Sequence, residues 1–412
     1  MAQRRLGAVR VGALLVSASY GVAFLLGSGE MAVHSGMAGS LYAIVTALGM
    51  LALGLTAGKL WHAGEPIWGV LGHQYGPLVR KLVALLSLVW MSGVLAAQIH
   101  GSVAILEIAG LPANRALVVT AVALLAMSSV NLGVAAIFFI VCLLASNLAL
   151  LHVLAELNGL LLYAHAWPSF IQDIYTAPRA ETLTTIVAIG FLVVTGSDYQ
   201  QFVIAARRSA DARLGCVFAS VFLMATGFLP AATVVAALHS GWLSGLTHPD
   251  GAIPWLILHA VGRAAPLCIG GILLAALGSG TAVTRAMICA LVNIRFVTPQ
   301  YEVAWRILIV AFGSAIATDG QTIVSTIVSL NVVYVSAVVL PFVLHQTGRQ
   351  VSPRCAFVML LTGATSSVFI AAMHSTGIGN VPNWMTLPLG LLASASVLIG
   401  WYLHRSRRGV RS

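Results

Sequence analysis

The chain has 412 residues, of which 59% are hydrophobic and only 8% are charged, and its formal net charge is +10. Soluble globular domains carry roughly 25% charged residues, so this composition excludes an ordinary soluble fold. The apolar runs are continuous and many approach 20 residues, which predicts membrane-spanning helices and not the alternating strands of a barrel. The five cysteines form no CxxC pair, so neither a disulfide framework nor a metal centre is expected.

Twelve apolar segments are predicted to cross the membrane, which makes the fold class all-α and polytopic. They cover residues 9–29, 38–60, 82–109, 115–132, 134–157, 182–206, 212–238, 265–293, 304–318, 321–345, 355–374 and 384–403. The longest outer loop, residues 158–181, is too short to fold alone. The whole chain, residues 1–412, is therefore expected to form a single transmembrane domain.

Lysine and arginine residues are distributed unevenly between the two sides of these segments. With the N-terminus inside, 17 of them fall in inner segments, 3 fall in outer segments, and Arg285 lies within a span. Such a bias is typical of membrane proteins, whose cytoplasmic loops collect positive charge. We therefore expect a protein of the bacterial inner membrane with both termini in the cytoplasm. The net charge is explained by topology and does not indicate nucleic-acid binding.

The order of the segments repeats along the chain. Residues 9–157 and 182–345 each contain two spans, an amphipathic connection, an unusually long span and two closely joined spans, and residues 355–403 add two helices. Because five is an odd number, the second set must run through the membrane in the opposite direction to the first. This arrangement is typical of inverted repeats, in which helices are broken near the middle of the bilayer.

Small residues mark where such breaks are expected. In the first span, Ser19 and Gly21 give one candidate and the tripeptide "GSG" further on gives another. In the sixth span, Gly190 is followed by "TGSD". We predict a loss of regular helical bonding within residues 17–30 and within residues 188–197. The alternative is continuous helices, since glycine also serves close packing in membranes.

Three stretches resemble the sodium:solute symporter family. The segment "SDYQQFVIAARRSADARLGCVFASVFLMATGFLP" is similar to the end of one core helix and the start of the next in that family. The segments "LGHQYGPLVRKLVALLSLVWMSGVLAAQIHGSVAILEIAGL" and "GAIPWLILHAVGRAAPLCIGGILLAALGSGTA" are similar to its third core helix and to its re-entrant and eighth core helices. The resemblance implies the LeuT-like fold, an inverted-repeat core of ten helices, followed here by two more. Nucleobase–cation symporters and amino acid–polyamine carriers also fit a chain that starts inside.

The resemblance also implies where solute and coupling ion bind. The solute pocket is expected between spans 1, 3, 6 and 8, with Gly190 and Phe191 near the family's substrate contacts. The family's sodium site uses an Ala-x-x-Ser-Ser/Thr pattern, and this chain has Ala276 and Ser279 followed by a glycine. Thr281 compensates only with a different geometry, so protons are a second candidate for the coupling ion. The predicted solute pathway is completed by Ser19, Tyr20, Gly21, Gln98 and Arg285.

Four polar side chains in the spans are candidates in their own right, because ionisable groups at membrane depth are costly. Asp198 is expected either to carry the coupling ion or to pair with the inner arginines, and Gln201, one turn away, to form an inner gate. Glu30 is either a coupling carboxylate or an outer-loop acid. Arg285 either forms a structural ion pair, with Asp198 and Glu30 as available partners, or binds an anionic solute.

The sequence therefore predicts a secondary active transporter that moves a small solute by alternating access, driven by a sodium or proton gradient. Its expected partners are that solute and the lipid bilayer, and no cofactor beyond the coupling ion is expected. A membrane sensor that keeps the fold without transport is the alternative from another class. Walker, GxSxG and His-Glu metalloprotease motifs do not occur in the sequence, which disfavours an enzyme.

Overall fold

The computed structural model describes residues 4–128, 132–377 and 381–409. Within these ranges the regular structure is helical, apart from one isolated bridge between Leu6 and Ala206. The apolar runs fold as helices because a chain in lipid must satisfy its backbone N–H and C=O groups internally. The predicted fold class, an all-α membrane protein, is confirmed.

In the first part of the chain, a helix interrupted near its centre is followed by a long, a short and a very long helix. The elements are α1 (Ala8–Ser19), the π-helical turn η1 (Ala23–Gly27), α2 (Ser28–Ser35), the 3₁₀ turn η2 (Gly36–Ser40), α3 (Leu41–Ala63), α4 (Ile67–Tyr75), α5 (Pro77–Ile108), α6 (Ala113–Met127) and α7 (Leu132–Glu156). Two short helices, α8 (Leu160–Ala164) and α9 (Ala166–Thr176), lead to the second part.

The second part has elements in the same order. They are α10 (Arg179–Thr195), α11 (Ser197–Ile204), α12 (Ser209–Thr226), α13 (Leu229–His239), η3 (Pro249–Gly251), α14 (Ala252–Ala260), η4 (Gly262–Ala264), α15 (Ala265–Asn293), η5 (Pro299–Tyr301), α16 (Glu302–Ala317) and α17 (Ile323–Gln346). The chain ends with α18 (Pro353–Ser375), η7 (Asn383–Met385) and α19 (Thr386–Gly409). The two amphipathic connections predicted from sequence form the short helices α4 and α14.

Each of the twelve predicted spans falls on helical structure in the described part of the chain, and residues 129–131, which belong to the span predicted over 115–132, lie outside that part. Among the described residues, 8 helical stretches are long and apolar enough to cross a membrane, and shorter apolar helices accompany them. Large apolar side chains remain exposed on the outer faces of several helices, as a lipid-facing surface requires. Examples are Val118 and Val122 on α6, Leu308 and Phe312 on α16, and Val368 and Phe369 on α18. The number of helices that cross stays a prediction.

Both predicted helix breaks are confirmed. The first lies between α1 and η1, within residues 17–30, and the second separates α10 from α11 at Gly196, within residues 188–197. At Gly196 the backbone is extended, with φ −67° and ψ 123°. Each break interrupts the first helix of one part of the chain, so the two breaks occupy corresponding positions in the element order.

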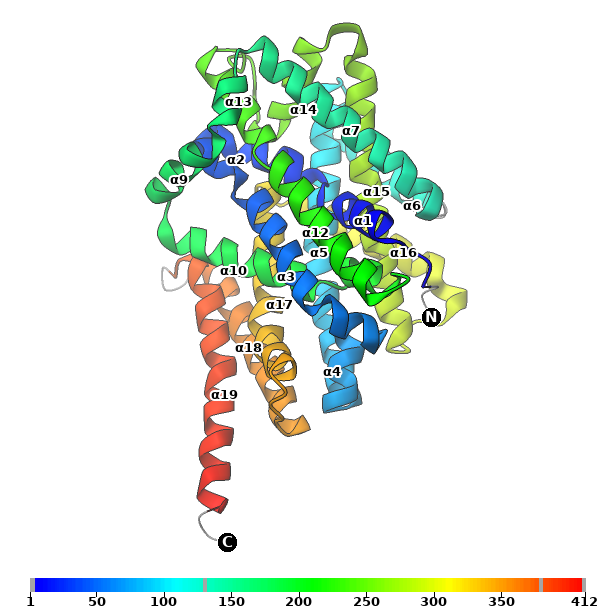
Figure 1. The fold of residues 1–412 in the computed structure, drawn as a ribbon, viewed down its shortest axis with the longest axis vertical. Coiled ribbons are helices and arrows are strands. Elements are labelled where there is room, and N and C mark those ends of the chain that lie inside the picture. The colour runs from blue at the N-terminus through cyan, green and yellow to red at the C-terminus, as the bar shows by residue number, and fades with distance from the viewer. Residues whose placement is uncertain (1–3, 129–131, 378–380, 410–412) are drawn as a thin grey trace.

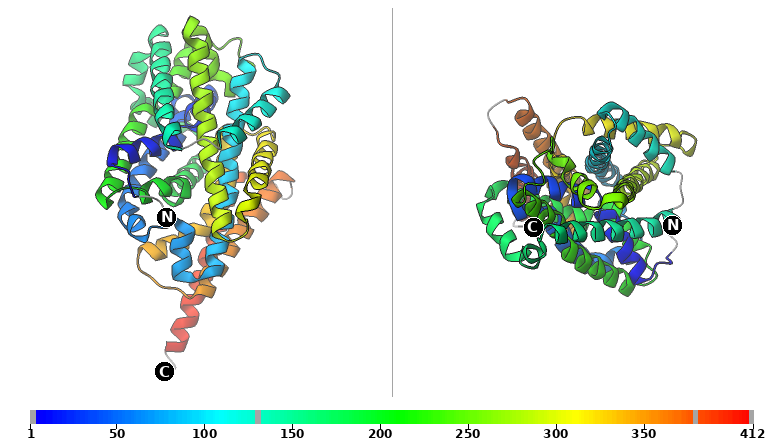
Figure 2. Two further views of the ribbon diagram at one scale, coloured as in Figure 1. Left: turned by 90° about the vertical axis from the view of Figure 1, so that its right-hand side faces the viewer. Right: turned by 90° about the horizontal axis from the view of Figure 1, so that it is seen from above.

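The long helix α5 is at the centre of the packing. It contacts α15, α16 and α17, and Figure 2 shows α5 and α15 running side by side. Trp90 on α5 and Tyr334 on α17 are fully buried and pack with ring centroids 6.0 Å apart. Each ring buries a large apolar surface against the other helix, so this pair stabilises the packing of α17 on α5.

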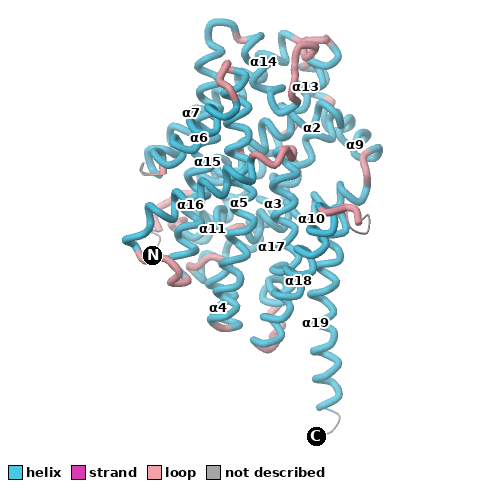
Figure 3. The backbone as a smooth tube through the Cα atoms, turned by 180° about the vertical axis from the view of Figure 1, so that it is seen from behind, coloured by secondary structure: helices cyan, strands magenta, loops and turns pink. Residues whose placement is uncertain are grey.

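The molecule has two distinct ends. Figure 1 shows α13 and α14 at one of them, called the α14 end below, and α4 with the C-terminal half of α19 at the other, called the α4 end. Seen from behind in Figure 3, loops form a small part of the chain, and α19 projects beyond the rest of the molecule. The helix α5 runs from α4 towards the α14 end, so its side chains make contacts at both ends of the protein and in its middle.

Candidate solute and coupling-ion site

A buried glutamine fills the first helix break. After α1 ends at Ser19, the backbone of Tyr20 leaves the helical region, with φ −80° and ψ 48°. The amide of Val22 donates to Oε1 of Gln98 on α5 at 3.1 Å. A Cβ atom at Gly21 would lie 2.6 Å from Nε2 of Gln98, so only glycine fits there without moving this side chain. The structure thus brings together four residues predicted for the solute pathway.

A small cavity adjoins this break. Its volume is about 10 Å³, and it is lined by Tyr20, Gly21, Val22, Leu25, Ser146, Ile272, Ala275 and Ala276. A space of this size holds about one water molecule, so in this structure the region next to the break is closed to a larger solute. Tyr20 extends past the cavity and donates from its hydroxyl to Oδ1 of Asn147 on α7 at 2.7 Å.

The predicted sodium ligands lie on α15 beside this region. Ala276 lines the small cavity, and Ser279 and Thr281 are buried further along the helix. The hydroxyl of Thr281 donates to the carbonyl oxygen of Gly278 in its own helix at 2.7 Å. The structure therefore places one of the three predicted residues at the cavity wall, and their role as ion ligands stays a prediction.

The second break is bridged by a different glutamine. Gln200 on α11 is fully buried, and its Nε2 donates to the carbonyl oxygen of Val194, before the break, at 3.0 Å. Its Oε1 accepts from the amide of Ile67, the first residue of α4, at 2.8 Å. The hydroxyl of Tyr334 on α17 donates to the carbonyl oxygen of Thr195 at 3.0 Å. Backbone groups freed at the break are thus satisfied by side chains from α11 and α17.

Asp198 lies in the first turn of α11, directly after the break, with only 4% of its surface exposed. Its Oδ1 accepts from the amide of Tyr199 at 2.9 Å. The hydroxyl groups of Tyr42, Tyr199 and Tyr334 lie within electrostatic reach of the carboxyl group. Among the described residues, the ion pairs within 4.0 Å do not join Asp198 to Arg207 or Arg208.

The inner arginine Arg207 instead lies 3.5 Å from Asp211, measured from Nε to Oδ2. Gly190 and Phe191, placed near the solute by family resemblance, lie in the regular part of α10 before the break. The nearest atom to a Cβ at Gly190 would be Cγ1 of Val45, at 3.8 Å. The carbonyl oxygen of Phe191 accepts from the hydroxyl of Thr195, the last residue before the break, at 2.6 Å.

Glu30 lies inside the protein and is not an outer-loop acid, which corrects one of the two predicted possibilities. Its side chain on α2 is buried, and Oε2 accepts from the amide of Ile323, the first residue of α17, at 2.9 Å. A carboxylate at a helix N-terminus is favourable because the free amides and the helix dipole there attract negative charge. Glu30 thereby fastens the second half of the broken first span, α2, to α17.

A histidine–aspartate pair lies near Glu30 at the α14 end. Nε2 of His100 on α5 is 3.0 Å from Oδ2 of Asp250 on η3, and both side chains are more than four-fifths buried. The Glu30 carboxylate interacts electrostatically with both groups. Burial alone would raise the pKa of Asp250, but the hydrogen bond and the positive charge of His100 outweigh it and hold this pKa below its ordinary value.

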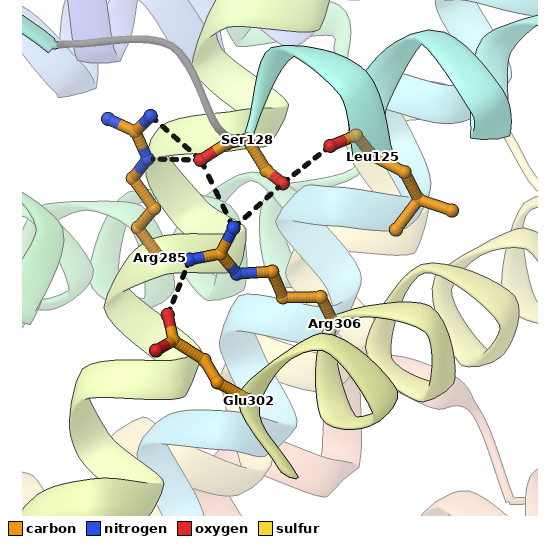
Figure 4. Close-up of polar contacts among 5 residues, drawn as sticks. All are labelled: Leu125, Ser128, Arg285, Glu302 and Arg306. Carbon is orange, nitrogen blue, oxygen red and sulfur yellow. Dashed lines mark hydrogen bonds and ion pairs between the residues drawn. The ribbon is translucent and has the colours of Figure 1, made fainter. Parts of the chain in front are cut away.

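Arg285 does not pair with either acid proposed for it. Its Nε and Nη2 donate to the carbonyl oxygen of Ser128, just after α6, at 3.0 and 2.8 Å. Arg306 on α16 reaches the same oxygen and also pairs with Glu302 (Figure 4). Cations are stabilised at helix C-termini, where carbonyl oxygens lack helical partners. The structure therefore favours a structural role for Arg285 that joins α6, α15 and α16.

At the C-terminal end of α11, the N-terminal segment of the chain packs against the residues that follow this helix. The amide of Arg207 donates to the carbonyl oxygen of Leu6 at 2.8 Å, and Nε1 of Trp61 on α3 donates to that of Ala206 at 2.8 Å. The Arg4 guanidinium lies over the Trp61 ring at 4.1 Å. Gln201, the predicted inner gate, is half-buried on α11 beside this junction, and that role stays a prediction.

Sequence reasoning missed Gln200, Asp250 and Arg4. The adjacent amides of Gln200 and Gln201 were both visible, but only the fold shows which one faces the break. Nothing in the sequence places η3 against α5, so the pairing of Asp250 with His100 could not be predicted. A positively charged N-terminus was explained by topology alone, which left no reason to expect its contact with Trp61.

Comparison with known proteins places this geometry in a recognised fold. No protein-family model matches the sequence, and no curated protein is detectably similar to it. Among solved structures, a Na⁺-coupled sialic acid symporter in a substrate-bound outward-open state is 12% identical, with a TM-score of 0.74 over 96% of this chain and 89% of that one.

Two other transporters share the fold at lower TM-scores. Mhp1, a nucleobase-cation-symport-1 family transporter in a closed conformation with a bound hydantoin, is 14% identical, with a TM-score of 0.55 over 98% of this chain and 93% of that one. A manganese transporter of Eremococcus coleocola is 14% identical, with a TM-score of 0.52 over 96% and 92%. At these identities the likeness establishes the fold. The chain is an integral membrane protein with the LeuT-like fold, as its sequence predicts.

Proposed function

We propose that this chain is a secondary active transporter that moves a small solute by alternating access around its two helix breaks. The observation that supports it most directly is the arrangement at the breaks, where Gln98 meets the freed amide of Val22 and Gln200 meets the freed carbonyl of Val194. In transporters built from inverted repeats, backbone groups at such breaks bind substrate or coupling ions. The fold shared with three ion-coupled or metal transporters supports the same reading.

The coupling ion is proposed to act through Asp198. In the described part of the chain, the ion pairs within 4.0 Å do not include this residue, although it is almost fully buried. A buried carboxylate without an ion-pair partner is costly, so the group is expected to hold a proton or a bound cation. The glycine after Ser279 removes one hydroxyl from the family's sodium pattern, which favours a proton.

The two parts of the chain, residues 9–157 and 182–345, are proposed to be inverted repeats, with the α4 end facing the cytoplasm. Their matching element order and matching breaks support this division. The excess of lysine and arginine in segments assigned to the inside supports the orientation. In this orientation the Leu6–Ala206 junction closes the inner side, and the Glu30 and His100–Asp250 contacts close the outer side.

The test is solute uptake by proteoliposomes that contain the purified full-length protein. A panel of labelled amino acids, nucleobases and acidic sugars is offered under imposed sodium or proton gradients, with sodium replaced by potassium in parallel. Concentration of one solute above its outside level, abolished when the gradient is collapsed, supports the proposal. Gradient-independent equilibration of a solute to equal levels would indicate a channel-like pathway and contradict it.

A further inference from the structure

Three titratable side chains from three elements meet at the α14 end. Glu30 comes from α2, His100 from α5 and Asp250 from η3, and His100 and Asp250 are in hydrogen-bond contact at 3.0 Å. Glu30 also binds the first amide of α17. The group of three, called the outer triad below, therefore links four elements that must separate if this end of the protein is to open.

The hairpin that carries Asp250 lies directly over the broken first span. A Cβ atom at Gly29 of α2 would lie 2.6 Å from Cγ1 of Ile253, in the first turn of α14, so α2 and α14 are in close contact because this residue is glycine. A cavity of about 260 Å³ lies just outside, between the end of α5 and η3, and Asp250 forms part of its wall. Protons from the outer solution therefore have a short route to the pair.

We propose that the outer triad is a proton-binding site that holds the α14 end closed, and that release of a proton from His100 allows this end to open. This inference rests on the proposed function, and it adds a site of proton action separate from Asp198. With His100 protonated, its positive charge attracts the carboxylate of Asp250 in direct contact and that of Glu30 through space. With His100 neutral, the charge-assisted hydrogen bond to Asp250 is lost, and so is the attraction between His100 and Glu30.

The sign of the pH dependence follows from these charges. Because the pKa of Asp250 lies below its ordinary value, its carboxyl group stays ionised around neutral pH, and the imidazole of His100 titrates in that range. Closure is then complete below the pKa of His100 and weakens as pH rises through it. Two further groups act on the triad electrostatically, namely Glu107 on α5, which strengthens the attraction for the cation, and His248 near Asp250.

The experiment measures opening directly and needs no solute. Spin labels are attached to cysteines placed at Ala113 and Thr247, two exposed positions on opposite walls of the outer cavity, after replacement of the less buried native Cys268 and Cys289. Distances are recorded in lipid nanodiscs from about pH 5.5 to about pH 8, the range in which imidazole titrates. We expect the open-to-closed ratio to rise by roughly fivefold or more over this range, a usual size for allosteric coupling.

Substitutions then assign the effect to the triad. His100→Gln and Asp250→Asn should each remove the pH dependence, and Asp250 lies on the short turn η3 and not within a long helix. His248→Gln should keep the dependence, and so should His73→Gln, which removes an exposed pair with Glu65 at 3.1 Å. A slope that survives in both His100→Gln and Asp250→Asn would overturn the proposal, as would a slope that disappears in His73→Gln. Because the distance measurement uses no solute, its result does not depend on whether the uptake test succeeds, and the two proposals can fail separately.

Discussion

Gln200 on α11 accepts a hydrogen bond from the amide of Ile67, the first residue of α4, at 2.8 Å, while its own amide group reaches back across the helix break to Val194. One buried side chain therefore ties the second helix break to a short helix at the α4 end. Any rearrangement of the break that moves Gln200 must either move α4 or lose this bond.

Gln200→Leu is expected to destabilise the protein and to loosen α4. The substitution leaves the amide of Ile67 and the carbonyl of Val194 without partners in a buried site, which costs roughly 1–3 kcal/mol for each group. The midpoint temperature of thermal unfolding in detergent should fall by several degrees. Hydrogen exchange of the backbone amides should become faster in residues 67–75. Gln201→Leu is the matched control, because its side chain makes no hydrogen bond in the described part of the chain. Equal effects of the two substitutions would contradict the role given to Gln200.

Gly21→Ala is expected to abolish transport while the protein still folds. The new methyl group would lie 2.6 Å from Nε2 of Gln98, so the glutamine must leave the break and release the amide of Val22. Gly270→Ala, near the start of α15 and in a position where the new Cβ meets open space, is the control. Uptake per folded protein in proteoliposomes is the measurement. Full uptake by Gly21→Ala would show that the geometry of the first break does not matter.

Arg285→Gln is expected to lower stability without changing which solutes are accepted. The loss of the contact from both nitrogens of the charged group to the carbonyl oxygen of Ser128 should cost roughly 1.5–3 kcal/mol in total. Arg285→Lys keeps the charge but not the two-nitrogen contact. Its stability should therefore lie between that of the unmodified protein and that of Arg285→Gln. If Arg285→Gln unfolds normally yet loses affinity for an acidic solute, the arginine faces the solute after all, and its proposed structural role is wrong.

Asp198→Asn is expected to uncouple uptake from the proton gradient. Asparagine keeps the size of the side chain and the acceptor for the amide of Tyr199, but it cannot bind a proton. Asp319→Asn, in an exposed loop after α16, is the control. Uptake per folded protein is compared with sodium replaced by potassium, from about pH 5.5 to about pH 8. Steep sodium dependence that Asp198→Asn leaves unchanged would place the coupling ion elsewhere.

The sequence was sufficient for the fold because apolar length, charge bias and segment order are all properties of the chain itself. The breaks were also predictable, because the small residues around Gly21 and Gly196 are signals that a short stretch of sequence contains. What the sequence does not contain is which distant side chains meet. Glu30 has two plausible surroundings from sequence, and only the packing of α2 against the start of α17 selects the buried one.

Arg285 shows the same limit in a different way. An arginine within a span suggests an ion pair with another charged residue in a span, because charge pairing is the usual solution. The chain instead satisfies it with the carbonyl oxygen of Ser128, a backbone group that every residue possesses and that no sequence pattern distinguishes. Side chain to backbone contacts of this kind depend on where helices end relative to one another, which is a property of the folded protein.

Alternating access is the central claim, and simultaneous distance measurements at both ends test it most directly. One pair of spin labels at Ala113 and Thr247 reports on the α14 end, and a second pair at Arg5 and Arg208, exposed residues on the two sides of the Leu6–Ala206 junction, reports on the α4 end. We predict two populations in lipid, in which one pair is long whenever the other is short, and an imposed change of pH should shift them in opposite directions. Distances that lengthen together at both ends, or one end that never opens, would contradict the account.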